Sequence, residues 1–108
     1  MTQVMLKNEE SQTVLLSIGG VAYEIHFYQF RTLTYIDVKK GKEYVLAGKR
    51  VLSNQWLIPR YVTAGSGNIR FETYSSDEDS YVWYEGFNTK YRLMAYGKKD
   101  LPDNYESE

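Results

Sequence analysis

The chain has 108 residues, the length of one ordinary domain, and can bury about 60 to 68 % of its unfolded surface without covalent cross-links. A hydrophobic share of 43 % and an aromatic share of 16 % exclude a disordered chain, while a formal net charge of −1 argues against a protein that mainly holds phosphate backbones. The absence of cysteine excludes disulfides and thiolate metal sites. Because the net charge is close to zero, nucleic acid is not expected as a partner.

Both ends of the chain are polar. Residues 1–12 form a polar leader without an apolar secretory core, and no run reaches the roughly 20 apolar residues that span a bilayer. Neither export nor membrane contact is expected, and synthesis in a cytoplasm fits. Residues 98–108 are predicted to be a flexible tail. A single β domain is predicted between them, over residues 13–97.

The first predicted unit is a hairpin. Residues 13–18 and 21–30 are two β-prone runs separated by Gly19-Gly20, a pair that readily adopts the positive φ of a tight turn. In the second run apolar and polar residues alternate with a period of two, which is typical of a strand with one buried face. Residues 33–39 carry strand-favouring side chains on both faces, so this run is predicted to be a central strand.

A second hairpin is predicted next. Lys40-Gly41-Lys42 is a turn that leads into a strand over residues 44–47. Gly48-Lys49-Arg50 is expected to interrupt this strand before the apolar pair Val51-Leu52.

The remaining strands are less regular. Residues 56–62 are apolar but contain Pro59, which lacks a backbone donor and places this piece at an edge, a bulge or an irregular crossing. Residues 69–74 and 91–96 alternate as strands do, whereas residues 81–87 are aromatic without a clear period.

Six or seven short strands without a long helical pattern predict an all-β fold. The expected architecture is a small antiparallel β-barrel or sandwich. Such a fold must protect its edge strands by closing the barrel, by charge or by pairing with a partner.

The sequence contains no recognisable catalytic, metal or cofactor motif. His26 is the only histidine, and it lies on the polar side of a predicted strand. The acidic run Asp77-Glu78-Asp79 lacks the spacing and turn glycine of a calcium loop, and Gly65-Ser66-Gly67 lacks the lysine and helix of a phosphate loop. An enzyme is therefore not expected.

Two clusters leave a binding function open. Tyr81, Trp83, Tyr84 and Phe87 place four rings within seven residues, and exposed rings stack on sugars or bases. Two predicted turns are basic, at Lys39, Lys40, Lys42, Lys49 and Arg50. Core packing and turn solubility explain both clusters as well. A small β-barrel binding module for glycan or single-stranded nucleic acid is the alternative function.

Several ordered patterns point to a known family. They are a Gln12-Thr13 entry to the first strand, the Gly19-Gly20 hairpin followed by Tyr23, a glycine before an apolar pair at residues 48–52, and Tyr91-Arg92-Leu93 after a Tyr/Gly turn. In these patterns the sequence resembles the baseplate plug proteins of contractile-tailed bacteriophages. The resemblance spans residues 12–97.

This resemblance implies a structural protein of a phage or prophage virion, made in the host bacterial cytoplasm. It implies a β-barrel-like plug that lies at the hub and spike of the tail baseplate and closes the tail tube. The partners would be hub, spike or tube proteins, with no cofactor, while the oligomeric state stays open. Contacts are expected at exposed aromatic residues and unpaired strand edges. The candidate interface residues are Tyr61, Trp83, Tyr84 and Tyr91.

Overall fold

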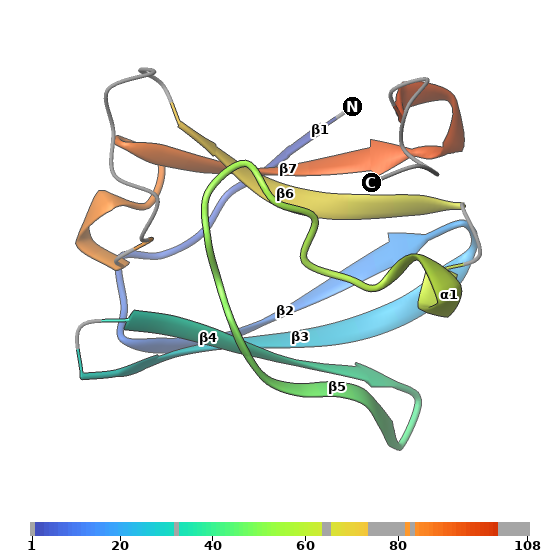
Figure 1. The fold of residues 1–108 in the computed structure, drawn as a ribbon, viewed down its shortest axis with the longest axis horizontal. Coiled ribbons are helices and arrows are strands. Elements are labelled where there is room, and N and C mark those ends of the chain that lie inside the picture. The colour runs from blue at the N-terminus through green and yellow to red at the C-terminus, as the bar shows by residue number, and fades with distance from the viewer. Residues whose placement is uncertain (1, 32, 64–65, 74–81, 83, 102–108) are drawn as a thin grey trace.

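Two antiparallel sheets lie face to face in the computed structural model, which describes residues 2–31, 33–63, 66–73, 82 and 84–101 (Figure 1). One sheet has the strand order β1-β7-β6, with bounds Thr2–Val4, Tyr91–Gly97 and Gly67–Thr73. The other has the order β2-β3-β4-β5, with bounds Ser11–Ile18, Val21–Phe30, Leu33–Lys40 and Glu43–Arg50. The predicted all-β class is confirmed, and the arrangement is that of a sandwich.

The predicted first hairpin is confirmed. Strands β2 and β3 pair without a register break from Ser11↔Tyr28 to Ile18↔Val21. Gly19 and Gly20 have φ of 60° and 80°, the left-handed values that a two-residue primed turn requires. Strand β4 lies between β3 and β5, as its two strand-favouring faces predicted.

The predicted interruption at residues 48–50 is wrong, because β5 continues through them to Arg50. The register passes from Ile36↔Lys49 to Val38↔Leu46, so Ala47 and Gly48 together oppose Asp37. This is a β-bulge, and Gly48 takes a φ of 67° in it. The glycine therefore bends the strand instead of ending it.

The segment after β5 crosses from one sheet to the other (Figure 1). Val51 N donates to Thr34 O at 2.8 Å in the four-stranded sheet, and Leu57 N donates to Ile69 O at 3.0 Å in the three-stranded sheet. Pro59 precedes α1, a single turn over Arg60–Thr63. Of the three arrangements predicted for this segment, an edge, a bulge or an irregular crossing, the structure shows the irregular crossing, which covers the outer edge of β6.

The ends of the chain contribute elements that the sequence did not predict. Strand β1 pairs with β7 through Val4↔Leu93, and Leu6 is part of the core. A short 3₁₀ helix, η1, spans Tyr84–Gly86 before β7, and another, η2, spans Lys98–Asp100 after it. Residues 102–108 of the predicted tail lie outside the described residues. None of the helices in the described ranges is long and apolar enough to cross a membrane.

The core lies between the two sheets. Phe71 of β6 packs edge-on against Phe27 of β3, with ring centroids 5.8 Å apart, and stacks on Phe87 at 5.4 Å. All three side chains are at most 1 % exposed. Aliphatic side chains from both sheets and from the crossing surround them: Ile25, Ile36, Val38, Val51, Leu57, Ile58, Ile69 and Leu93. The polar faces of both sheets are thereby left to point outward.

Candidate interaction surfaces

The outer face of the four-stranded sheet carries a group of rings, which we call the aromatic face: His26, Tyr28, Phe30, Tyr35 and Tyr44. Register brings them together, since Tyr28 lies directly opposite Tyr35 across the β3-β4 pair. Tyr28 stacks on Tyr35 with ring centroids 5.9 Å apart, and its ring is tilted by 34° to that of His26 at 5.3 Å, while Phe30 meets Tyr35 edge-on at 6.3 Å. Phe30 and Tyr44 are 58 % and 60 % exposed, so the face offers apolar area to a partner.

A carboxylate holds this face in place. Asp37 Oδ1 accepts a 2.7 Å hydrogen bond from Gly48 N in the bulge and a 3.3 Å bond from the hydroxyl of Tyr28. Burial and the neighbouring Asp37 raise the pKa of Tyr28, so this phenol stays protonated and donating. Lys39 Nζ lies 4.7 Å from the ring centroid of Tyr44, a cation–π contact across β4 and β5. The rings are therefore held in fixed positions.

A serine and the single histidine meet on the same face, a contact that the sequence did not predict. Ser11 Oγ lies 2.8 Å from His26 Nε2. Asp37 is opposite His26 in register, but its hydrogen bonds go to Gly48 and Tyr28, and none joins it to the imidazole. Among the described residues, the pair thus lacks the carboxylate that orients the histidine of a nucleophilic triad. The neighbouring hollow is small, about 120 Å³.

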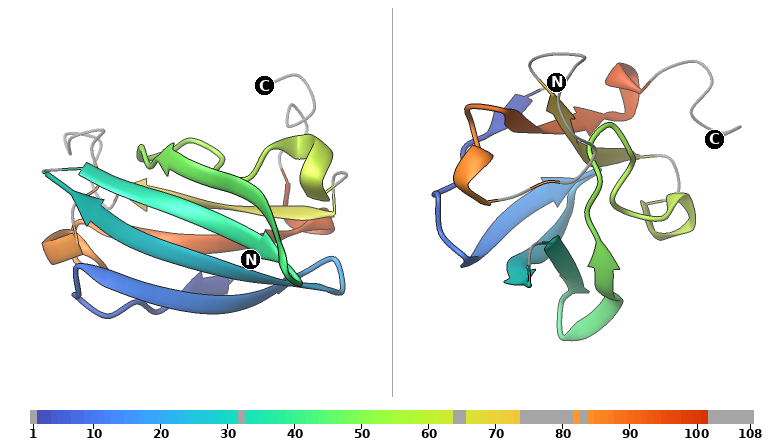
Figure 2. Two further views of the ribbon diagram at one scale, coloured as in Figure 1. Left: turned by 90° about the horizontal axis from the view of Figure 1, so that it is seen from below. Right: turned by 60° about the vertical axis from the view of Figure 1, so that its left-hand side comes forward.

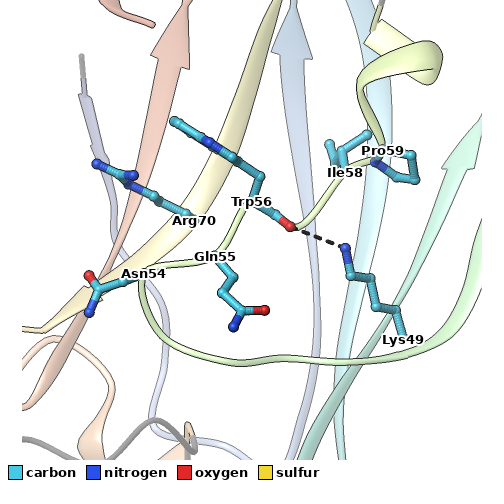
Figure 3. Close-up of a pocket in the computed structure, with 7 residues that line it drawn as sticks. All are labelled: Lys49, Asn54, Gln55, Trp56, Ile58, Pro59 and Arg70. Carbon is cyan, nitrogen blue, oxygen red and sulfur yellow. Dashed lines mark hydrogen bonds between the residues drawn. The ribbon is translucent and has the colours of Figure 1, made fainter. Parts of the chain in front are cut away.

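A larger hollow of about 410 Å³ lies between β5 and the crossing segment (Figure 3). It is lined by Lys49, Asn54, Gln55, Trp56, Ile58, Pro59 and Arg70. Lys49 Nζ donates to the carbonyl oxygens of Trp56 and Leu57 at 3.1 and 2.9 Å. Burial lowers the pKa of this ammonium. Lys49 therefore ties the crossing to β5, which explains the hollow as a structural junction.

The outer face of the other sheet supports this junction. The Arg70 guanidinium lies 4.5 Å from the Trp56 ring and 5.0 Å from the Tyr96 ring. Glu72 accepts hydrogen bonds from Arg70 at 3.0 Å, from Arg92 at 3.4 Å and from the hydroxyl of Tyr96. Burial opposes ionisation of Glu72, but the bonds from Tyr96 and Arg70 outweigh it and lower its pKa. The cluster is thus an ionised, closed network.

Replacing Glu72 with glutamine tests this network. A lowered folded-state pKa means that the carboxylate stabilises the fold above its ordinary pKa of 4.5, and that this contribution is lost as the pH falls through the folded value. We expect Glu72→Gln to lose about 1–3 kcal/mol of unfolding free energy at neutral pH. It should also show a weaker pH dependence than the wild type in acid. Denaturant titrations at several pH values measure both effects, with the exposed Glu43→Gln as the matched control. Equal acid sensitivity of Glu72→Gln and the wild type would contradict the assignment.

The structure separates the four candidate interface residues. Tyr61 in α1 is 82 % exposed, whereas Tyr84 in η1 is half-buried and its hydroxyl lies 3.4 Å from Glu10 Oε1. These two lie at opposite ends of the sandwich (Figure 1). Tyr91 is only 5 % exposed and belongs to the core, because its ring packs against Gly86, where a Cβ would approach it to 2.8 Å. Trp83 lies outside the described residues.

The predicted basic cluster also divides. Lys49 points to the crossing, while Lys39 lies over the Tyr44 ring on the outer face. Lys39 and Lys49 therefore do not form one basic surface. Among the residues that the structure describes, no group of three or more His, Asp or Glu side chains is placed to hold a metal ion.

The sequence did not predict that the rings of the aromatic face lie together, although it placed several of them on outward strand faces. The alternation of β3 placed His26 and Tyr28 on the polar side, and Tyr35 on the face of its strand opposite Ile36. Only the register of the Phe30↔Leu33 hairpin shows that these outward rings become neighbours. Outward aromatic residues at equal distances from a tight turn are the signal that could have identified them.

One family model matches almost the whole chain. The family is described as "Cyanophage baseplate Pam3 plug gp18", and the match covers residues 1–98. This range contains every described strand of both sheets. No curated protein matches the sequence.

Proposed function

Because the chain belongs to the cyanophage baseplate plug family, we propose that it is the plug of a phage or prophage tail, placed at the hub and spike, where it closes the tail tube. Membership of this family supports a structural role in a phage baseplate. The match over residues 1–98 is the observation that carries the proposal. The chain would be made in the host bacterial cytoplasm and act without a cofactor or a reaction.

The aromatic face is the proposed contact with hub, spike or tube proteins. Aromatic side chains are enriched in protein interfaces because they bury a large area at little cost in conformational entropy. Phe30 and Tyr44 are exposed, and the stacked Tyr28 and Tyr35 already hold fixed positions. Tyr61 and Tyr84 remain proposed contacts at the two ends of the sandwich. The buried position of Tyr91 supports a role in the core instead.

A double substitution on the aromatic face tests this contact. We expect Phe30→Ser with Tyr44→Ser to fold normally, since both side chains are exposed, but to enter tail particles at least about tenfold less than the wild type. The measurement is mass spectrometry of particles from a strain that lacks the native gene and carries the variant. Met5→Ser, which removes a side chain that is 70 % exposed elsewhere, is the control.

The same variants distinguish the baseplate plug from the alternative function, a binding module. A module for glycan or single-stranded nucleic acid, built on the aromatic residues 81–87 and the basic turns, would keep its ligand binding with the double substitution, and particles would assemble without the protein. Normal incorporation of the double variant would assign the contact to another surface. Loss of incorporation by Met5→Ser as well would show that the assay reports general surface changes.

A further inference from the structure

Within the part of the chain that the structure describes, strand β2 is the one sheet edge without a protective feature. The edge of β6 is covered by the crossing, through Asn54 N to Phe71 O and Leu57 N to Ile69 O. Strand β5 carries Glu43, Lys49 and Arg50 and is bent by its bulge, and β1 has only three residues. Charge, bulges, shortness and covering segments are the usual ways to block edge pairing. Strand β2 is eight residues long, pairs with β3 without a bulge and carries no charged side chain.

The outward backbone groups of β2 can be assigned from its pairing. Gln29 N donates to Glu10 O, so the even-numbered residues of this strand face β3 with their hydrogen-bonding groups. The odd-numbered residues therefore direct their N–H and C=O groups to the free edge: Ser11, Thr13, Leu15 and Ser17. Within the described part of the chain no backbone hydrogen bond reaches this side. Figure 2 (left) shows β2 along one border of the molecule.

The side chains beside this edge are suited to a second strand. Leu15 is 75 % exposed, the largest exposed fraction among the large hydrophobic side chains of the described strands. Its outward neighbours are two serines and a threonine, which are small and neutral. A second strand placed here would bury Leu15 and satisfy four donors and four acceptors without desolvating a charge.

We propose that β2 pairs in antiparallel orientation with β2 of a second copy of this chain, forming a two-fold dimer in which the two four-stranded sheets become one. The identical edges match in length, and pairing of Thr13 with Leu15 of the second copy uses all four outward residues of each strand. In this orientation the acidic residues Glu9 and Glu10 lie beside the uncharged Gly19-Gly20 turn of the other copy. No like charges meet along the paired strands. This inference does not rest on the proposed function.

Sedimentation of the purified chain tests the dimer first. Pairing along one strand buries less than about 1,200 Å², the lower limit of specific stable interfaces, so we expect a weak dimer that dissociates in the micromolar range or above. Leu15→Lys should raise it at least about tenfold, because two ammonium groups would be brought to one edge. Tyr61→Lys places the same charge on another exposed side chain and should leave it unchanged. A chain that stays monomeric at millimolar concentration overturns the proposal, as does an equal effect of both variants.

Cross-linking tests the strand pairing independently, and the absence of native cysteine makes it specific. An equimolar mixture of Thr13→Cys and Leu15→Cys should form disulfide-linked dimers on mild oxidation, since directly paired strands bring Cα atoms to about 5.5 Å. Tyr44→Cys, also exposed, should remain monomeric under the same conditions. Linked dimers of Tyr44→Cys with none from the mixture would overturn the proposal. Protection of the β2 edge only after addition of another tail protein would assign the edge to that protein and likewise overturn it.

Discussion

Replacement of Phe71 by alanine is expected to lower the free energy of unfolding by about 3–5 kcal/mol, the cost of a large cavity in a closed core. Phe71 is fully buried and joins the two sheets, through its edge-on contact with Phe27 and its stack on Phe87. A domain of this size has a total stability of about 5–15 kcal/mol, so the variant should lose a large share of it. Denaturant titration followed by far-UV circular dichroism measures the loss.

The matched control for this core variant is Phe30→Ala. Phe30 is 58 % exposed and contacts Tyr35 only at the ring edge, so its removal should cost at most about 1 kcal/mol. The ratio between the two losses reports how far burial, rather than ring chemistry, stabilises the sandwich. Similar losses for the two variants would contradict the described core.

Replacement of Asn68 by alanine is expected to release the crossing segment. Asn68 is fully buried, and its side chain accepts from Ile58 N at 3.1 Å and donates to Ile58 O at 2.7 Å. The alanine variant leaves both backbone groups of Ile58 without this partner, at a cost of about 2–4 kcal/mol. The junction of Lys49 and Trp56 should loosen as a consequence.

Hydrogen exchange measures this release at single residues. In Asn68→Ala the amides of Leu57 and Ile58 should exchange much faster than in the wild type, while the amide of Ile25 in β3 should keep most of its protection. Gln55→Ala, an exposed change in the same crossing, should leave all three unchanged. Unchanged protection at Leu57 and Ile58 in Asn68→Ala would show that the crossing is held by other contacts.

The sequence predicts the hairpins well because their causes are local. The alternation of Tyr23, Ile25 and Phe27 with polar residues fixes the buried face of β3, and Gly19-Gly20 supplies the positive φ of the turn. Pro59 correctly marks a piece that cannot join a sheet centre. The resemblance to plug proteins, based on short ordered patterns, agrees with the family match.

The parts that were missed depend on contacts distant in sequence. Gly48 reads as a turn residue, but the carboxylate of Asp37 on the next strand holds it in a bulge. Tyr91 is of a residue type that is common in interfaces, and only its packing against Gly86 shows that it belongs to the core. The leader contains no strong strand signal in Thr2–Val4, because that strand exists through its pairing with β7. Register and tertiary packing, rather than propensity, decide these positions.

Mass spectrometry of intact tail particles tests most directly whether this chain is part of a tail baseplate. Particles would be purified from the source cells after prophage induction and separated into tubes and baseplates. We predict that the chain is present in the particles and follows the baseplate fraction together with the hub and spike proteins. A chain that is expressed in these cells but absent from the particles, and that is recovered with glycan or nucleic acid instead, would contradict a place in the baseplate.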